Sequence, residues 1–194
     1  EQTANWVEAQ NEVTFGYLNS IPFRDAIKDR LQGLLDYPRI SAPRQHGDYY
    51  YYYRNNGLQN QSVLYRKKAL DAEEEVFLNP NTFKEDGTIS LAGSSFTKDG
   101  SLFTFLISEG GSDWRKAIVL NTETNEQVGD SLRNIKFSGI SWKGTDGFYY
   151  SSYDQPKEGS VLSAKTQFHK LFYHKMGTSQ SEDKLVFGGE NQPR

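Results

Sequence analysis

The sequence contains no cysteine, one methionine and three histidines, and no apolar run that approaches the roughly 18 residues of a membrane span. Without cysteine the chain forms neither disulfides nor thiolate sites, although this absence does not fix the compartment. The net charge of −3 is spread over interspersed signs and provides no polycationic surface. We therefore expect no nucleic-acid or membrane partner, and the localisation stays open between cytoplasm and periplasm.

Motifs for metal binding and hydrolysis are also missing. The sequence has no H-E-x-x-H motif and no calcium-loop motif, so we expect no metal site and no cofactor. His46 precedes a predicted turn, whereas His169 and His174 should lie on opposite faces of one strand. The carboxylates of the run 71–75 and of the pair Glu182-Asp183 fall in predicted turns, where we expect solvated charge.

The nucleophile motif G-x-S-x-G of the α/β-hydrolases does not occur in the sequence. The nearest pentapeptide, Gly110 to Trp114, has Trp where the motif requires the last Gly. We expect it to link two strands, and we assign no catalytic residue in this chain.

Strands and turns are what the sequence does contain, and 90–121 is the clearest unit. Lys98-Asp99-Gly100 should turn the chain between two apolar runs, since Gly tolerates positive φ. The expected strands are 91–97, 102–108 and 114–120, and Gln127-Val128 should open a fourth.

The same pattern returns further along the chain. Trp142 takes the place of Phe96 and Asp146-Gly147 that of Asp99-Gly100, at offsets of 46 and 47 residues. Further strands are expected at 49–53, 63–68, 75–78, 170–175 and 184–187. Four strands per 40 to 50 residues are typical of propeller blades, so we predict about three blades. An ordinary antiparallel sandwich is the alternative.

Two amphipathic helices are predicted before these repeats. Apolar residues recur at helical spacing over 5–18, and again from Phe23 to Leu34, where Pro22 suits the first turn and Pro38 prevents continuation. The fold class is thus mainly β, a partial propeller preceded by two α-helices. Because three blades leave open edges and the helices lack a partner, we expect the chain to be a fragment.

Several segments in one order resemble the N-terminal part of the prolyl oligopeptidase family of serine peptidases. They are WVEAQNEVTFGYL, DYPRISAPRQHGDYYYYYRNNGLQNQSVLY, FLNPNTFKEDGTISLAG, GGSDW and KLFYHKMGTSQSEDKLVF. The resemblance covers essentially the whole chain. It implies a seven-bladed propeller that caps an α/β-hydrolase domain, with 1–37 as the N-terminal helical segment of the hydrolase domain and 38–194 as the first three blades.

The resemblance also implies a function. The parent would be an endopeptidase that cleaves short peptides after proline, with the propeller as a size filter. Its catalytic triad would lie in the missing C-terminal α/β-hydrolase domain, so we expect this chain alone to be inactive. A propeller-type binding or scaffold module without chemistry is the alternative.

The resemblance extends to one strand of a substrate site. The segment 148–153 resembles the strand that contributes an aromatic side chain to the outer apolar subsite, a role that falls on Tyr149. A slip of one residue would transfer the role to Phe148 or Tyr150, and packing of all three between blades is the alternative. We also expect the polar segment 154–167 to be a mobile loop, and the isolated chain to self-associate through exposed apolar surface.

Overall fold

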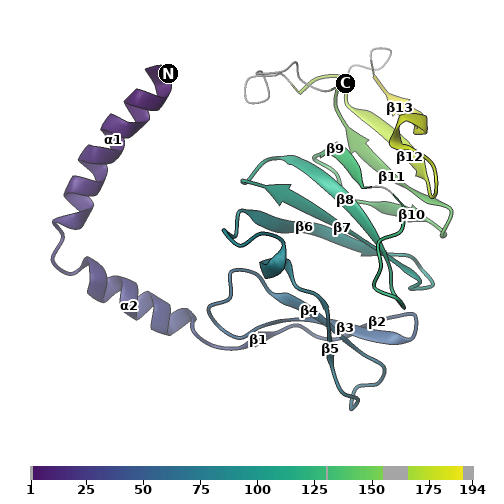
Figure 1. Ribbon diagram of the computed structural model, residues 1–194, viewed down its shortest axis with the longest axis horizontal. Coiled ribbons are helices and arrows are strands. Elements are labelled where there is room, and N and C mark those ends of the chain that lie inside the picture. Colours follow the sequence, from purple (N-terminus) through teal and green to yellow (C-terminus); the bar gives the residue numbers. More distant parts are fainter. Residues whose placement is uncertain (1, 130, 155–165, 190–194) are drawn as a thin grey trace. The chain divides into compact units, whose positions relative to one another are not determined.

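The computed structural model describes residues 2–129, 131–154 and 166–189 of the chain (Figure 1). The chain divides into two compact units. The helical unit comprises Glu1–Arg39 and Asn55–Gln59, and the propeller unit comprises Ile40–Arg54 and Asn60–Arg194. Most of the predicted mobile segment 154–167 lies outside the described residues.

Both predicted helices are confirmed in the helical unit, as α1 (Gln2–Asn19) and α2 (Arg24–Leu35). Pro22 lies in the turn before α2 rather than in its first turn. The amide of Asp36 closes α2 by donating to the carbonyl of Gln32. Neither helix contains a buried residue, and neither is long and apolar enough to cross a membrane.

The propeller unit contains three sheets, each with four consecutive antiparallel strands, which confirms the predicted three blades (Figure 1). Blade 1 has β2 (Arg44–His46), β3 (Tyr49–Asn55), β4 (Val63–Lys67) and β5 (Glu75–Leu78), and the short β1 (Arg39–Ile40) also joins β3. Blade 2 has β6 (Ile89–Phe96), β7 (Leu102–Glu109), β8 (Trp114–Asn121) and β9 (Leu132–Lys136). Blade 3 has β10 (Ser141–Lys143), β11 (Gly147–Ser152), β12 (Lys170–Lys175) and β13 (Lys184–Gly188).

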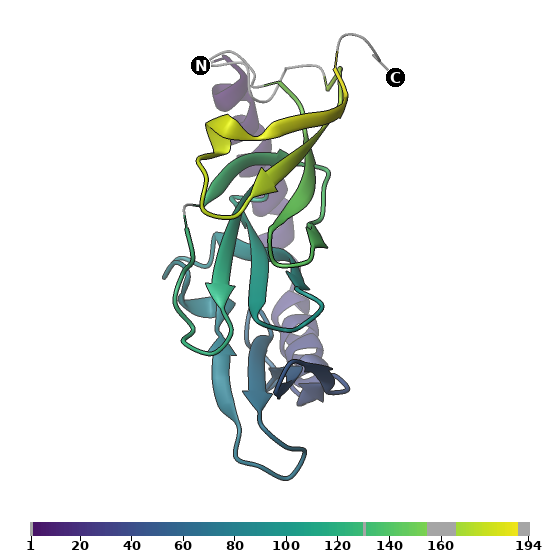
Figure 2. The same ribbon diagram turned by 90° about the vertical axis from the view of Figure 1, so that its right-hand side faces the viewer.

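In the described part of the chain two short 3₁₀ helices accompany the blades. They are η1 (Pro80–Thr82), between β5 and β6, and η2 (Gln180–Glu182), between β12 and β13. The three sheets follow one another in sequence order, from blue through green to yellow (Figure 2). Side-chain clusters shared by consecutive blades show that these blades pack face to face, as the propeller pattern requires.

The fourth strand of blade 2 differs from the prediction. Gln127 forms only an isolated bridge with Leu120, and β9 begins later, where Leu132 pairs with Ala117 of β8. Gly129 has a φ of 69° and turns the chain between the bridge and the strand. Gln127-Val128 thus initiates the pairing, but the strand itself is five residues further on.

Among the described residues the hydrophobic core consists of two clusters, each between neighbouring blades. The first joins blades 1 and 2 around Phe103, and the second joins blades 2 and 3 around Phe148; neither of these two side chains has any solvent exposure. The faces of β7 alternate between the clusters, with Phe105 in the first and Leu106 in the second. Each blade therefore buries a face by packing against its neighbour.

The turns of blades 1 and 2 also make a close contact. Gly100 has a φ of 76°, and a Cβ atom at this position would lie 2.1 Å from the amide nitrogen of Gly47. Real Cβ atoms do not approach backbone this closely, so only glycine fits without displacing one turn from the other. Gly111 has nearly the same φ, 75°, but a Cβ atom there would meet no other atom within 4 Å.

Gly100→Ala and Gly111→Ala should therefore separate backbone strain from steric contact. Both substitutions place alanine at positive φ, which costs roughly 1–2 kcal/mol. We expect Gly100→Ala to cost at least about 2 kcal/mol more, because the turns of two blades must move apart. Urea unfolding measures both, and equal destabilisation would contradict the importance of this contact.

Candidate functional site

The pentapeptide that most resembles a nucleophile motif is a turn, as predicted. It lies between β7 and β8, and both Gly110 and Gly111 have positive φ. The hydroxyl of Ser112 accepts a hydrogen bond from the amide of Trp114 at 3.1 Å, and its carbonyl accepts one from the Ser108 hydroxyl at 2.6 Å. These contacts give Ser112 a role in the turn.

The three histidines lie in separate environments. His46 ends β2 and stacks on Phe96 of blade 2, with ring centroids 4.1 Å apart and planes inclined by 8°. His169 precedes β12 and stacks on Tyr153, whereas His174 is buried within β12. No group of three potential metal-ligating side chains occurs among the residues that the structure describes.

The predicted solvated charge at Asp183 is wrong, because its side chain is only 3% exposed. One carboxylate oxygen accepts the hydroxyl of Tyr150 at 2.7 Å, and the other lies 2.7 Å from Nδ1 of His174. Burial, followed by the hydrogen bond to Asp183, raises the pKa of Tyr150. The neighbouring Glu182 is exposed and accepts the amide of Ser179 in a capping box.

The other carboxylate run is exposed, as predicted, but two of its members form ion pairs. Glu74 pairs with Arg54, and Glu75 pairs with Arg66 through Nε at 2.6 Å. The Arg66 side chain is only 8% exposed, so Glu75 supplies the counter-charge for a largely buried cation.

Gln180 extends this polar network from blade 3 to blade 2. Its Oε1 accepts the amide of Arg133 at 2.9 Å, and its Nε2 donates to the carbonyl of the same residue at 2.8 Å and to the hydroxyl of Tyr150 at 3.2 Å. The side chain thus pairs with the backbone of β9 as another strand would. Tyr150, Asp183 and His174 bond to one another within blade 3, and Gln180 connects them to blade 2, which gives this network a structural role.

Replacing Tyr150 with Phe should destabilise the protein by about 1–3 kcal/mol at neutral pH, because a buried carboxylate loses a donor. The raised pKa of Tyr150 means that the folded state retains a proton that the unfolded state releases above about pH 10. The stability that the retained Tyr150 proton contributes is fully present below pH 10 and is lost as the pH rises further. The unfolding free energy should therefore fall less steeply above pH 10 in Tyr150→Phe than in the wild type.

Urea melts between pH 7 and 11 test this expectation. Burial also raises the pKa of Tyr51, which remains in the variant. Ionisation of Tyr51 should therefore cause part of the loss of stability at alkaline pH in both proteins. Tyr17→Phe is a suitable control because Tyr17 is 71% exposed. Identical alkaline slopes for wild type and Tyr150→Phe would contradict the role given to Tyr150.

The structure separates the three aromatic candidates on β11. Phe148 and Tyr150 are 0% and 4% exposed and belong to the cluster between blades 2 and 3. Tyr149 is half-buried on the other face of the strand and lies beside Tyr173 of β12, with ring centroids 5.1 Å apart. Of the three, only Tyr149 is outside the packing between these blades.

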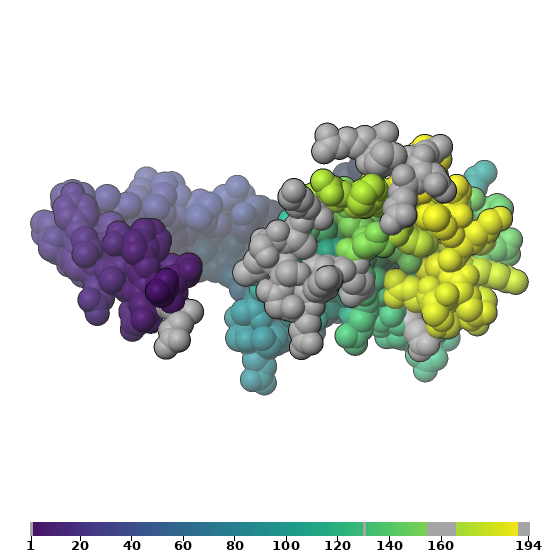
Figure 3. Space-filling view, turned by 90° about the horizontal axis from the view of Figure 1, so that it is seen from above, coloured from purple at the N-terminus to yellow at the C-terminus, as the bar shows by residue number. Residues whose placement is uncertain are grey.

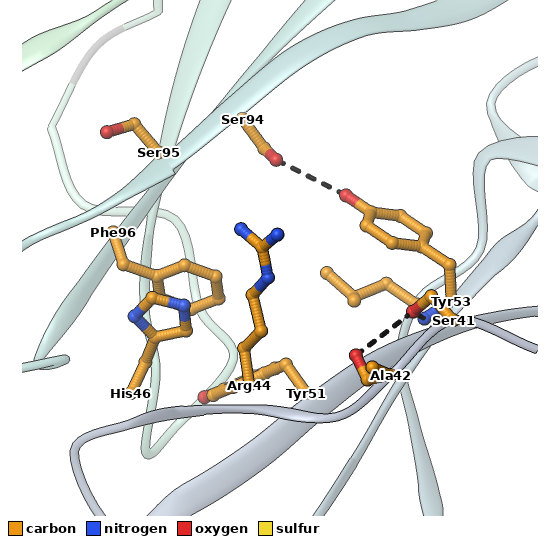
Figure 4. Close-up of a pocket in the computed structure, with 10 residues that line it drawn as sticks. Ser41, Ala42, Arg44, His46, Tyr51, Tyr53, Ser94, Ser95 and Phe96 are labelled. Carbon is orange, nitrogen blue, oxygen red and sulfur yellow. Dashed lines mark hydrogen bonds between the residues drawn. The ribbon is translucent and has the colours of Figure 1, made fainter.

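A pocket of about 570 Å³ lies between blades 1 and 2 (Figure 4). Blade 1 contributes Arg44 and His46 from β2 and Tyr51 and Tyr53 from β3, while β6 of blade 2 lines the opposite side. The remaining lining residues are Ser41, Ala42, Leu64, Ser94, Ser95 and Phe96. Prediction from sequence missed this pocket, because it placed His46 only next to a turn and did not indicate which strands would face it.

Stacked four-stranded antiparallel sheets define the larger unit as part of a β-propeller. A family model described as the prolyl oligopeptidase N-terminal β-propeller domain matches residues 1–194. The prolyl endopeptidase of Elizabethkingia meningoseptica is 54% identical over 194 residues, and prolyl oligopeptidase A of Amanita bisporigera is 35% identical over 221 residues. The chain belongs to the prolyl oligopeptidase family.

Solved structures agree with this assignment. Prolyl oligopeptidase B from Galerina marginata, bound to a 35mer hydrolysis and macrocyclization substrate, matches with a TM-score of 0.89 and 26% identity. That match covers 100% of this chain and 30% of the other. The alignments with the two relatives above also cover 100% of this chain, but they cover only 27% and 29% of the relatives' own lengths.

Proposed function

We propose that this chain is the N-terminal part of a serine endopeptidase that cleaves short peptides on the carboxyl side of proline. The observation that carries the proposal is the match of the whole chain to a family whose relatives are named prolyl endopeptidases. Because the chain spans less than a third of those relatives, the chemistry of the whole protein belongs to segments beyond these 194 residues.

Within this proposal the blades exclude substrates rather than react with them. The 194 residues contain no G-x-S-x-G nucleophile motif, and Ser112 is engaged in a turn. An α/β-hydrolase domain with a Ser-Asp-His triad would carry out the cleavage. The blades would close one side of the active-site chamber and admit only short peptides.

The two helices fit a partner of this kind. Trp6, Val13 and Tyr17 of α1 are exposed by 64%, 72% and 71%, and Phe23, Ile27, Leu31 and Leu34 on or beside α2 are all more than half exposed. Such stripes require an apolar partner surface. We assign residues 1–37 to the hydrolase domain and 38–194 to the propeller, and we expect the isolated chain to self-associate, which light scattering measures.

The assay compares the 194-residue chain with the full-length protein that contains it. We expect the full-length protein to hydrolyse a Gly-Pro chromogenic substrate and to leave the matched Gly-Ala substrate almost intact, while the 194-residue chain hydrolyses neither. Hydrolysis without a proline preference would refute the proposed substrate class. Activity of the short chain would show that the nucleophile lies within it.

Tyr149 is the proposed substrate-facing residue of this chain, in the outer apolar subsite. Its half-buried ring on the face of β11 that is turned away from blade 2 supports this role, since Phe148 and Tyr150 are committed to the core. The neighbouring ring of Tyr173 restricts its position, as a subsite that orients an apolar side chain requires.

Tyr149→Ala in the full-length protein should lower kcat/KM by about tenfold for a peptide with a large apolar residue at the outer position, because one apolar contact is lost. A peptide with glycine at that position should be affected little. Tyr65→Ala is the matched control, since Tyr65 is also half-buried and stacks on another tyrosine, Tyr52, at 5.8 Å. An equal loss for both peptides would argue against a subsite.

A further inference from the structure

The pocket between blades 1 and 2 contains one positive charge and no negative charge. Its ten lining residues include Arg44 and His46 but no aspartate or glutamate. Figure 4 shows the Arg44 guanidinium in the middle of the pocket, between the stacked rings of His46 and Phe96 on one side and the ring of Tyr53 on the other. None of the ion pairs or side-chain hydrogen bonds found among the described residues involves this guanidinium.

Hydroxyl groups complete the polar part of the pocket. The hydroxyls of Tyr53 and Ser94 lie 3.2 Å apart and connect blade 1 to blade 2 across the pocket. One of the two hydroxyl protons forms the hydrogen bond between these oxygens, so the other hydroxyl proton can be donated to a ligand. Figure 4 shows Ser94 and Ser95 on the β6 side of the guanidinium.

The wall formed by β6 is held in place from its other side. Trp142 of β10 donates a hydrogen bond from Nε1 to the carbonyl of Ser95 at 3.4 Å. In addition, the pairing register of β6 with β7 shifts between Leu91 and Gly93. β2, β6 and β10 are the first strands of their blades and lie at sheet edges. In a closed propeller such edges surround a central channel, so a ligand in the channel would reach this pocket.

We propose that this pocket binds a carboxylate group of a peptide, with Arg44 as the charged ligand and the Tyr53–Ser94 hydroxyl pair as a further donor. A planar guanidinium matches a carboxylate with two parallel hydrogen bonds. The inference rests on the proposed peptidase function, because it gives that function a preference for peptides that carry a negative group away from the cleavage site.

His46 contributes shape and not a second charge. Burial, and then the neighbouring Arg44, lower the pKa of His46, which favours its neutral ring. A neutral ring stacked on Phe96 provides a flat wall beside the guanidinium. The pocket therefore offers a single positive charge, which suits a single carboxylate.

Isothermal titration calorimetry of the full-length protein tests the proposal with three short peptides of otherwise equal sequence. One ends in a free carboxylate, one ends in an amide, and one ends in an amide but contains a glutamate. We expect at least one of the two carboxylate peptides to bind roughly tenfold more tightly than the plain amide, the factor that a modest charge-assisted hydrogen bond supplies. Which of the two binds more tightly distinguishes a peptide terminus from an acidic side chain.

Arg44→Gln should remove this preference, and Arg44→Lys should retain a part of it because the charge remains but the bidentate geometry is lost. Arg44 is exposed, so neither substitution should impair folding. Lys175→Gln, which removes an exposed positive charge from blade 3, is the control for net charge and should bind like the wild type.

Equal binding of all three peptides to the wild type, or an undiminished preference in Arg44→Gln, would overturn the proposal. These outcomes are independent of cleavage, which the Gly-Pro assay measures. If the protein cleaves after proline but shows no carboxylate preference, the proposed peptidase function stands and the proposed carboxylate site is refuted. If the protein binds carboxylate peptides through Arg44 but cleaves none, the proposed carboxylate site stands and the proposed peptidase function is refuted.

Discussion

Packing between neighbouring blades is the constraint on which the propeller unit depends. A four-stranded sheet has two faces, and its own residues cover neither of them. Blade 2 lies between two other blades, so the side chains of β7 alternate between the two core clusters and all but its end residues are buried. β13 at the far end of the described sheets remains exposed along four of its five residues (Figure 3). A strand's burial is thus set by its neighbours rather than by its own sequence.

This constraint explains which parts of the fold are predictable. β7 and β11 have apolar runs next to Gly turns, and the repeat from Phe96 to Trp142 is structurally real, since each ring packs on the first buried ring of the next strand, Phe103 or Phe148. β2 has only Arg44, Gln45 and His46, a polar triplet without a strand signal. The predicted start of β9 is five residues too early because nothing in the sequence fixes where a strand resumes after a glycine turn.

The candidate site residues also divide into those whose position the sequence predicts and those whose position it does not. Strand alternation correctly separates Tyr149 from Phe148 and Tyr150, but only the position of blade 2 shows which face is buried. The prediction for Asp183 fails because a carboxylate within a polar run carries no sign of burial, although the capping box formed by Ser179 and Glu182 is recognisable from the sequence. Burial of Asp183 involves His174 on the preceding strand and Tyr150, which is more distant in sequence, and neither pairing shows in the sequence around Asp183.

Where the packing between blades is incomplete, the chain has surface available for other partners. The aromatic side chains around Phe77 and Phe103 fill the interior of the contact between blades 1 and 2, whereas the pocket with Arg44 lies towards the first strands, where hydroxyls and a guanidinium join the aromatic rings. Among the described residues the Arg44 guanidinium has no charged partner, which is tolerated because the side chain stays exposed to solvent. Burying this charge against a neutral wall would be costly. A carboxylate ligand would remove that cost, since it supplies the opposite charge at the moment of burial. The same packing that stabilises the blades therefore leaves, at one edge, the position where we propose that a carboxylate binds.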